Sequence, residues 1–203
     1  MGRTTGLADP AMSSGDKTAA NNRIAFTRTY LEMTDMPTRA SLPAPAGRVA
    51  LMRCHKPTLA FYRFLYGEVG RNWLWYERLL LDDAALLDLI RRENVEIYVL
   101  YVDGGPAGFT ELTFDPSGDC EISYFGMMPD FVGGGYGRYL LNWAIHYAWS
   151  AKIRRLWLHT CTMDSPRALP FYQRAGFRAY HREELEVADP RPIMSQFGLS
   201  PDP

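Results

Sequence analysis

The chain has 203 residues, with a hydrophobic fraction of 47% and an aromatic fraction of 13%, which is typical of a folded domain with a substantial core. Its formal net charge of −1 offers no bulk attraction for nucleic acid. No apolar run approaches the roughly 18 residues of a membrane-spanning helix. The three cysteines, Cys54, Cys120 and Cys161, form an odd set without the spacing of a disulfide framework. We therefore expect reduced thiols in a cytoplasmic protein.

The sequence divides into three segments. Residues 1–22 are rich in Gly, Ser, Thr, Ala and Asn and lack the apolar stretch of a secretory signal, so we expect a flexible N-terminal extension. Residues 23–187 alternate between strand-like and helix-like patterns and are expected to form the folded domain. Residues 188–203 are a proline-rich C-terminal tail, which is expected to lack regular structure.

In the first half of the domain, the pattern predicts a strand over residues 24–33, whose alternation breaks at Arg28, and a second strand over 49–53. A helical region begins at residues 56–58, and Asp82-Asp83 is a plausible N-cap for a helix that continues to Arg92. The segment 61–76 between them is unusually aromatic. Its side chains either belong to the core or overhang a binding site.

In the second half, three strand-like runs cover residues 95–101, 107–114 and 120–128. Their separators, residues 103–106 and 115–118, have strong turn chemistry, which predicts an antiparallel meander. A helix over 137–151, a strand over 155–161, a helix over 166–175 that Gly176 ends, and a strand over 177–187 follow. This order predicts an α+β fold around one central mixed sheet.

A glycine-rich loop lies where the meander is followed by a helix, in the stretch Pro129-Asp130-Phe131-Val132-Gly133-Gly134-Gly135-Tyr136-Gly137-Arg138. Uncovered backbone N–H groups at a helix N-terminus form a site for a phosphate or pyrophosphate. The dinucleotide pattern G-x-G-x-x-G fails, because its last position is Arg138 or Leu140, and no Gly-Lys-Ser/Thr is present for a P-loop.

Together with the stretch Ala168-Leu169-Pro170-Phe171-Tyr172-Gln173-Arg174-Ala175-Gly176-Phe177, this loop resembles the GNAT acetyltransferase superfamily. The family's Q/R-x-x-G-x-G/A loop corresponds to residues 132–137, and its A-x-x-x-Y-x-x-x-G-F motif to residues 168–177. The resemblance covers roughly residues 95–187. It implies a GNAT-like central mixed, mostly antiparallel sheet of six to seven strands flanked by helices. It also implies transfer of an acetyl group from acetyl-coenzyme A to a primary amine by direct attack in a ternary complex.

The resemblance assigns the cofactor contacts. The loop residues Gly133, Gly134, Gly135, Tyr136 and Gly137 are expected to hold the pyrophosphate of coenzyme A through backbone N–H groups. Val132 stands where the family usually has Gln or Arg, so Arg138 is expected to supply the cation. Backbone N–H groups of Phe125, Met127 and Met128 are expected to polarise the thioester carbonyl. Ser165 stands where the family often has an Asn that touches the pantetheine arm.

An alkylammonium has a pKa of about 10.4 and must lose a proton before it attacks the thioester. The candidate base is Glu121, whose place relative to the loop resembles that of the catalytic glutamate in the histone-acetylating branch of the family. Glu111 is the second choice, and a water relay stays open. The alternative for Glu121 is a solvated strand-edge carboxylate. Tyr172 matches the family position that protonates the departing thiolate.

Two alternatives remain open at the level of function. One is a non-catalytic acyl-coenzyme A-binding sensor or interaction module with the same fold. The other is transfer through an acylated Cys161, which His159 would assist from two positions away on the same strand. No metal is expected, because this pair lacks further ligands at sensible spacing. The expected partner is a small-molecule or peptide amine and neither nucleic acid nor membrane, and we allow for a homodimer.

Overall fold

A computed structural model describes residues 22–38 and 40–200. Most of the expected N-terminal extension (1–22) therefore lies outside the described residues. The strands are β1 (Arg23–Met33), β2 (Val49–Arg53), β3 (Val95–Val102), β4 (Gly105–Phe114), β5 (Asp119–Met127), β6 (Arg155–Cys161) and β7 (Arg178–Ala188). The α-helices are α1 (Leu59–Gly70), α2 (Asp83–Ile90), α3 (Tyr136–Ser150), α4 (Ala168–Ala175) and α5 (Arg191–Gln196). Short 3-10 turns are η2 (Arg71–Trp73), η3 (Glu77–Leu80) and η4 (Pro129–Phe131).

The strands form one seven-stranded sheet in the order β2-β3-β4-β5-β6-β1-β7. All neighbouring pairs are antiparallel except β5 and β6, which are parallel. The predicted mixed, mostly antiparallel sheet of six to seven strands is therefore confirmed. The first strand of the sequence lies between β6 and β7, at the other end of the sheet from β2.

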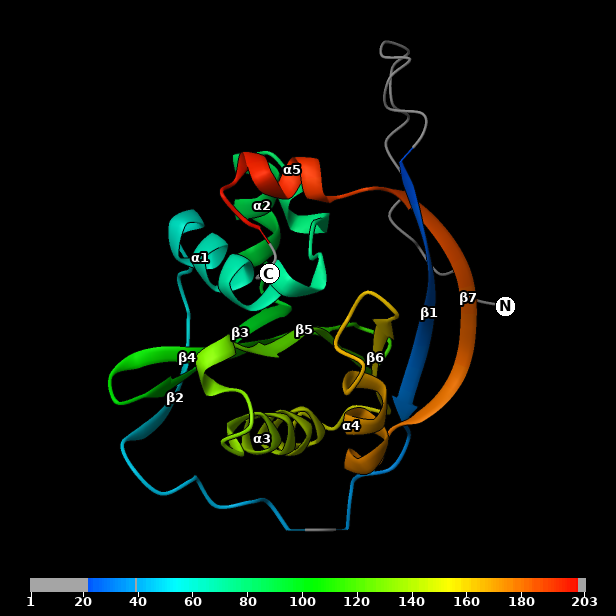
Figure 1. Ribbon diagram of the computed structural model, residues 1–203. Coiled ribbons are helices and arrows are strands. Elements are labelled where there is room, and N and C mark those ends of the chain that lie inside the picture. Colours follow the sequence, from blue (N-terminus) through cyan, green and yellow to red (C-terminus); the bar gives the residue numbers. More distant parts are fainter. Residues whose placement is uncertain (1–21, 39, 201–203) are drawn as a thin grey trace.

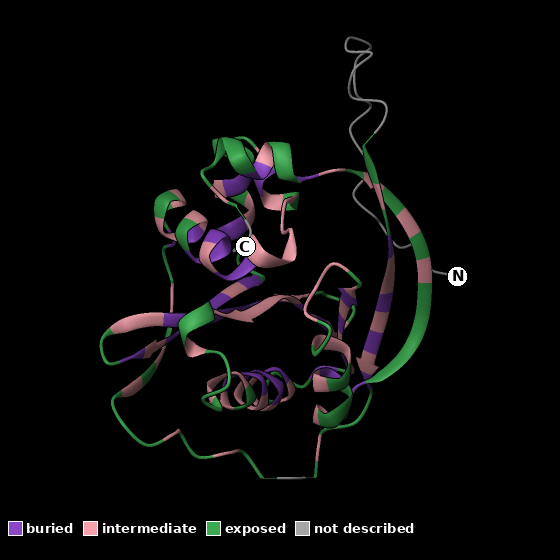
Figure 2. Ribbon diagram, viewed as in Figure 1, coloured by how far each residue is buried: buried purple, intermediate pink, exposed green. Residues whose placement is uncertain are grey.

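The helices cover both faces of the sheet. In Figure 1, α3 and α4 lie on one face, and α1, α2 and α5 lie on the other. Each face has its own buried cluster: Leu141, Ile145 and Leu156 belong to the first, and Tyr62, Leu86 and Phe109 to the second. Figure 2 shows the buried residues on the inner sides of the helices and along the central strands.

Local signals start the helices where the sequence predicts. The Thr58 side chain accepts a hydrogen bond from the N–H of Phe61, and Asp82 accepts one from the N–H of Ala85, so both residues cap their helices. Gly176 ends α4 in a left-handed conformation. No helix in the described part of the chain is long and apolar enough to cross a membrane.

The C-terminal segment departs from expectation, because α5 is a helix where we expected no regular structure. A proline is tolerated in the first turn of a helix, where its missing N–H would have no partner, so Pro190 and Pro192 are compatible with α5. Met194 is fully buried against the cluster of α1 and α2, and this packing stabilises the helix.

Candidate active site

A cavity of about 440 Å³ lies where β5 and β6 separate. The two strands pair only from Asp119 to Glu121 on β5, and beyond this point each contributes a wall of the cavity. The N–H of Met128 donates to the carbonyl of Ala107 on the β4 side at 2.9 Å. Because hydrogen-bonded residues alternate along an antiparallel pair, the N–H groups of Phe125 and Met127 face the gap. Met128 has its N–H engaged within the fold and does not line the cavity.

The glycine-rich loop forms one end of this cavity. Gly133, Gly135, Gly137 and Arg138 line it, whereas Gly134 and Tyr136 do not. Gly133 and Gly135 have φ angles of +94° and +83°, a region that side-chain-bearing residues avoid, and Gly135 is the N-cap of α3. The loop therefore needs glycine for its backbone conformation, and it leaves the first N–H groups of α3 uncovered.

Three arginines surround the same end: Arg138 at the start of α3, Arg167 before α4 and Arg174 on α4. All three are exposed, and none forms an ion pair with another described residue. We call them the cofactor-end arginines. Sequence reasoning identified only Arg138, since Arg167 and Arg174 reach the cavity through the packing of α4. Ser165 also lines the cavity and accepts a hydrogen bond from the N–H of Arg167.

The aromatic segment 61–76 divides between two roles. Tyr62 and Tyr66 on α1 are buried in the core, whereas Trp73 and Trp75 line the cavity. Trp75 donates through its indole N–H to Asp164 at 3.4 Å, which joins the segment to the loop after β6. A side chain at Gly70 would collide with Trp75, with a Cβ contact of 2.5 Å, so glycine there admits the indole.

The two candidate carboxylates lie in different surroundings. Glu111 is fully buried, accepts hydrogen bonds from Arg78 at 2.6 Å and from the Tyr62 hydroxyl at 2.7 Å, and does not line the cavity. Glu121 has a side chain that is 23% exposed, and its Oε1 lies 3.7 Å from Nδ1 of His159. Burial, with a smaller contribution from the charge of Glu111, raises the pKa of Glu121 to about 7. Glu121 can therefore exchange a proton near neutral pH, whereas Glu111 is held in a structural ion pair.

Tyr172 on α4 lines the cavity and packs edge-on against Phe125, with ring centroids 6.2 Å apart. Burial raises the pKa of its hydroxyl well above the usual value, so the group keeps its proton.

His159 and Cys161 both line the cavity, as their spacing on one strand predicts. Burial raises the pKa of the Cys161 thiol to about 11, which disfavours the nucleophilic thiolate. No group of three or more metal-binding side chains occurs among the residues that the structure describes.

Comparisons with known proteins identify relatives of the chain. A family model described as "Acetyltransferase (GNAT) family" matches residues 56–177. An uncharacterized N-acetyltransferase of Methanocaldococcus jannaschii is 33% identical over 107 residues, which cover 49% of this chain and 44% of that protein. The chain thus spans less than half the length of this curated relative.

Solved structures show the same fold. A GCN5-related N-acetyltransferase from Sphaerobacter thermophilus has a TM-score of 0.59 at 18% identity, over 80% of this chain and half of that one. One from Kribbella flavida has a TM-score of 0.55 at 17% identity, over 85% and 62%. An acetyltransferase of Trypanosoma brucei has a TM-score of 0.52 at 23% identity, over 66% and 96%.

Proposed function

Because the chain belongs to the GNAT family of acetyltransferases, we propose that it transfers an acetyl group from acetyl-coenzyme A to a primary amine. One observation carries the proposal: the gap between β5 and β6 opens into the same cavity as the glycine-rich loop at the start of α3. Such a cavity offers backbone donors to a thioester at one point and to a pyrophosphate at another.

The cofactor end suits the charges of coenzyme A. The uncovered N–H groups at Gly135 and the following residues would bind the pyrophosphate. The cofactor-end arginines would bind the remaining phosphate charge, because none of them is neutralised by a carboxylate of the described chain. The N–H groups of Phe125 and Met127 would polarise the thioester carbonyl, since they face the gap.

The chemistry would proceed by direct attack of the amine on the thioester. Glu121 would act as the base for the amine proton, directly or through a relay, and its pKa near 7 suits that role at neutral pH. Tyr172 would protonate the departing thiolate, because its hydroxyl keeps its proton and belongs to the wall of the cavity. The high pKa of Cys161 favours this route over an acylated enzyme.

The test measures thiol release from acetyl-coenzyme A in the presence of amines. Saturable binding of acetyl-coenzyme A together with amine-dependent thiol release would support the proposal. Binding without thiol release, across amines, polyamines, amino acids and peptides, would instead identify a non-catalytic sensor. A stable acetylated protein, detected by mass spectrometry without amine, would show transfer through Cys161.

A further inference from the structure

At the end of the cavity away from the glycine-rich loop, the carboxylate of Glu77 and the guanidinium of Arg28 line the wall, and Glu183, which also pairs with Arg28, does not line the cavity. Nη2 of Arg28 on β1 lies 3.7 Å from Oε1 of Glu77, and its Nη1 lies 4.0 Å from Oε1 of Glu183 on β7. The Tyr124 hydroxyl donates to Glu77 at 3.1 Å, and the Glu77 side chain is still 45% exposed. Two carboxylates thus share the single guanidinium of Arg28, whereas the cofactor-end arginines at the opposite end have no carboxylate partner among the described residues.

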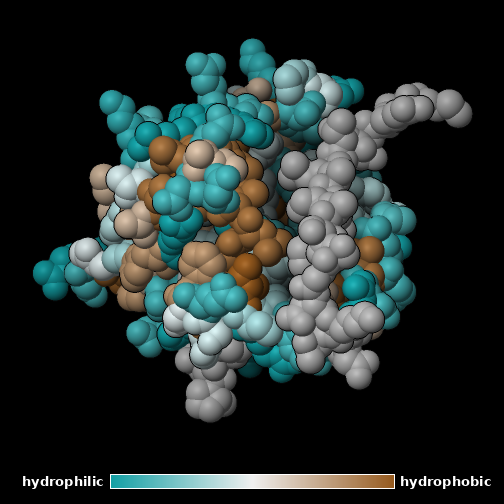
Figure 3. Space-filling model, turned by 90° about the horizontal axis from the view of Figure 1, so that it is seen from above, coloured by the Kyte–Doolittle hydropathy of each residue, from teal (hydrophilic) through white to brown (hydrophobic). Residues whose placement is uncertain are grey.

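This charge distribution selects the acceptor. An ammonium group would meet the Glu77 carboxylate beside the rings of Phe26 and Tyr124, which line the cavity and over which the guanidinium groups of Arg28 and Arg78 already lie. A carboxylate on the acceptor would meet Glu77, and the guanidinium of Arg28 is already shared between Glu77 and Glu183. Repulsion between like charges that are partly withdrawn from water is costly. Figure 3 shows the upper side of the molecule, where α5 lies in Figure 1, with hydrophobic side chains gathered near its centre and hydrophilic ones around them.

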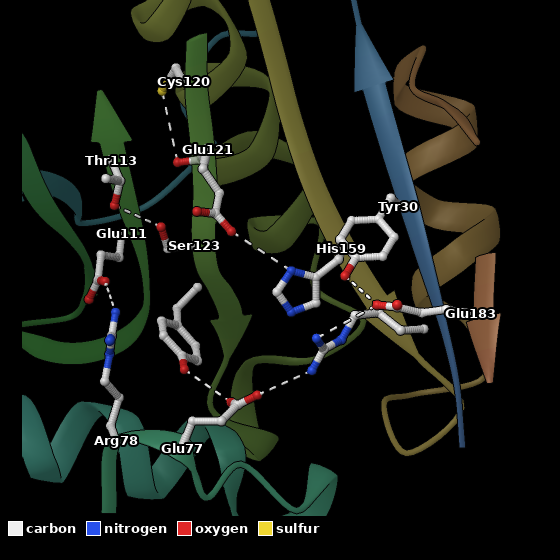
Figure 4. Close-up of polar contacts among 12 residues, drawn as sticks. Tyr30, Glu77, Arg78, Glu111, Thr113, Cys120, Glu121, Ser123, His159 and Glu183 are labelled. Carbon is white, nitrogen blue, oxygen red and sulfur yellow. Dashed lines mark hydrogen bonds and ion pairs between the residues drawn. The ribbon is translucent and has the colours of Figure 1, made fainter. Parts of the chain in front are cut away.

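Glu121, the base expected from the sequence, is separated from the cavity by the side chain of His159. His159 lines the cavity and Glu121 does not. In Figure 4, His159 lies between Glu121 and Tyr30, and the ring nitrogen that does not face Glu121 is directed away from it. Other charged or titratable groups around the imidazole are Arg28 and Tyr30 on β1 and Glu183 on β7. Burial and the charge of Arg28 lower the pKa of His159 to about 4, so its ring is unprotonated at neutral pH.

We propose that the acceptor is a primary amine without a carboxylate, that it binds as an ammonium against Glu77, and that His159 takes its proton. Glu121 acts behind His159, because its carboxylate faces Nδ1 and stabilises the imidazolium that forms. The proposal rests on the acetyl transfer proposed above and adds the acceptor class and the group that contacts the amine.

The step balances as follows. Nε2 of His159 accepts one proton from the ammonium, and the freed lone pair attacks the thioester carbonyl carbon. The carbon–sulfur bond then breaks, the amide remains, and the thiolate takes the second proton lost by the nitrogen, through Tyr172. The proton on His159 leaves to solvent, so one proton is released for each acetyl group transferred.

The acceptor class is tested with amines and the amino acids that carry the same side chain: tryptamine against tryptophan, phenethylamine against phenylalanine, histamine against histidine, and putrescine against ornithine. We expect kcat/KM for thiol release to be at least tenfold higher for the amine of the best pair. In Glu77→Gln the ratio of kcat/KM for the amine to that for the matching amino acid should be smaller than in the wild type. Equal or better use of the amino acids by the wild-type protein would overturn the acceptor class and leave acetyl transfer intact.

The role of His159 is tested with His159→Gln, Glu121→Gln and the control His55→Gln, which changes an exposed histidine outside the cavity. With the best amine of the panel, we expect His159→Gln to lower kcat about 100-fold and Glu121→Gln about tenfold. The dissociation constant for acetyl-coenzyme A should stay within twofold in both. The wild-type kcat/KM should rise with pH around a midpoint near 7. This rise should be absent from both His159→Gln and Glu121→Gln.

Two results would overturn the role of His159. One is a His159→Gln protein with wild-type kcat and an unchanged midpoint, since Glu121 would then act directly or through water. The other is a Glu121→Gln protein that keeps the midpoint near 7, and this result decides the matter even if His159→Gln does not fold. As a check on a merely structural role, added imidazole should partly restore thiol release in His159→Ala. Absence of thiol release from the wild-type protein with every amine would instead refute acetyl transfer itself.

Discussion

Replacing Glu121 with glutamine is expected to make the protein more stable above pH 7, whereas the same change at Glu111 should destabilise it. In the folded protein the pKa of Glu121 is about 7, against 4.5 for the model value. A raised pKa in the folded state gives stability that is present in full below pH 4.5 and is lost as the pH rises through 7. At 1.36 kcal/mol for each pH unit between these values, the loss is about 3 kcal/mol. Glutamine does not ionise, so the Glu121→Gln variant does not lose this stability as the pH rises.

Glu111 provides the matched comparison. Its carboxylate is fully buried against Arg78, whose side chain is only 14% exposed. Glutamine at this position leaves the guanidinium without a counter-charge, and breaking a buried pair in this way costs about 3–5 kcal/mol. The two neighbouring strands of the meander therefore hold carboxylates whose removal has opposite effects on stability above pH 7.

The measurement is urea unfolding of the wild type and both variants at pH 5 and pH 8.5. For Glu121→Gln, the stability relative to wild type should increase by about 2.5 kcal/mol between the two pH values, because part of the effect is already present at pH 5. A relative stability of Glu121→Gln that is the same at both pH values would refute the raised pKa. A Glu111→Gln protein as stable as wild type would refute the structural role of the Arg78 pair.

Three further predictions concern the cofactor. Gly135→Glu should abolish measurable acetyl-coenzyme A binding in calorimetry, because it strains a positive φ and adds a charge beside the phosphates, while Gly104→Glu, at φ +91° in the β3–β4 turn, should bind normally. Tyr172→Phe should lower kcat by at least tenfold and change the acetyl-coenzyme A dissociation constant little, and equal effects on both would contradict its acid role. Arg167→Gln and Arg174→Gln should each weaken binding severalfold and reduce its dependence on salt, and an unchanged salt dependence would show that these arginines do not contact phosphate.

Local patterns predicted the elements well, because turns and caps are encoded within a few residues. The turn residues around Gly104 and Gly118 indicate the meander, and Thr58 and Asp82 mark helix starts. The helix α5 was missed, since the prolines there suggested irregular structure and the burial of Met194 depends on distant residues.

The site was predicted in part. The glycine-rich loop could be identified from the sequence because its glycines are contiguous. By contrast, the contact between Glu121 and His159 joins two strands that pair over only three residues. The broken alternation at Arg28 marks a charge inside a strand pattern, and this side chain lines the cavity. Nothing local distinguished Glu111 from Glu121, whose difference is one of burial and partners.

The place of β1 in the sheet has a consequence for assembly. Thr27 on β1 hydrogen-bonds to Thr162, 135 residues later, so the first described strand finds its neighbours only after most of the chain has been made. Contacts of such high sequence separation slow folding, because a long loop must close before they form. Phe26 and Arg28 belong to this strand and line the cavity. We therefore expect the end of the cavity that we propose to bind the amine to form late in folding, when β1 enters between β6 and β7.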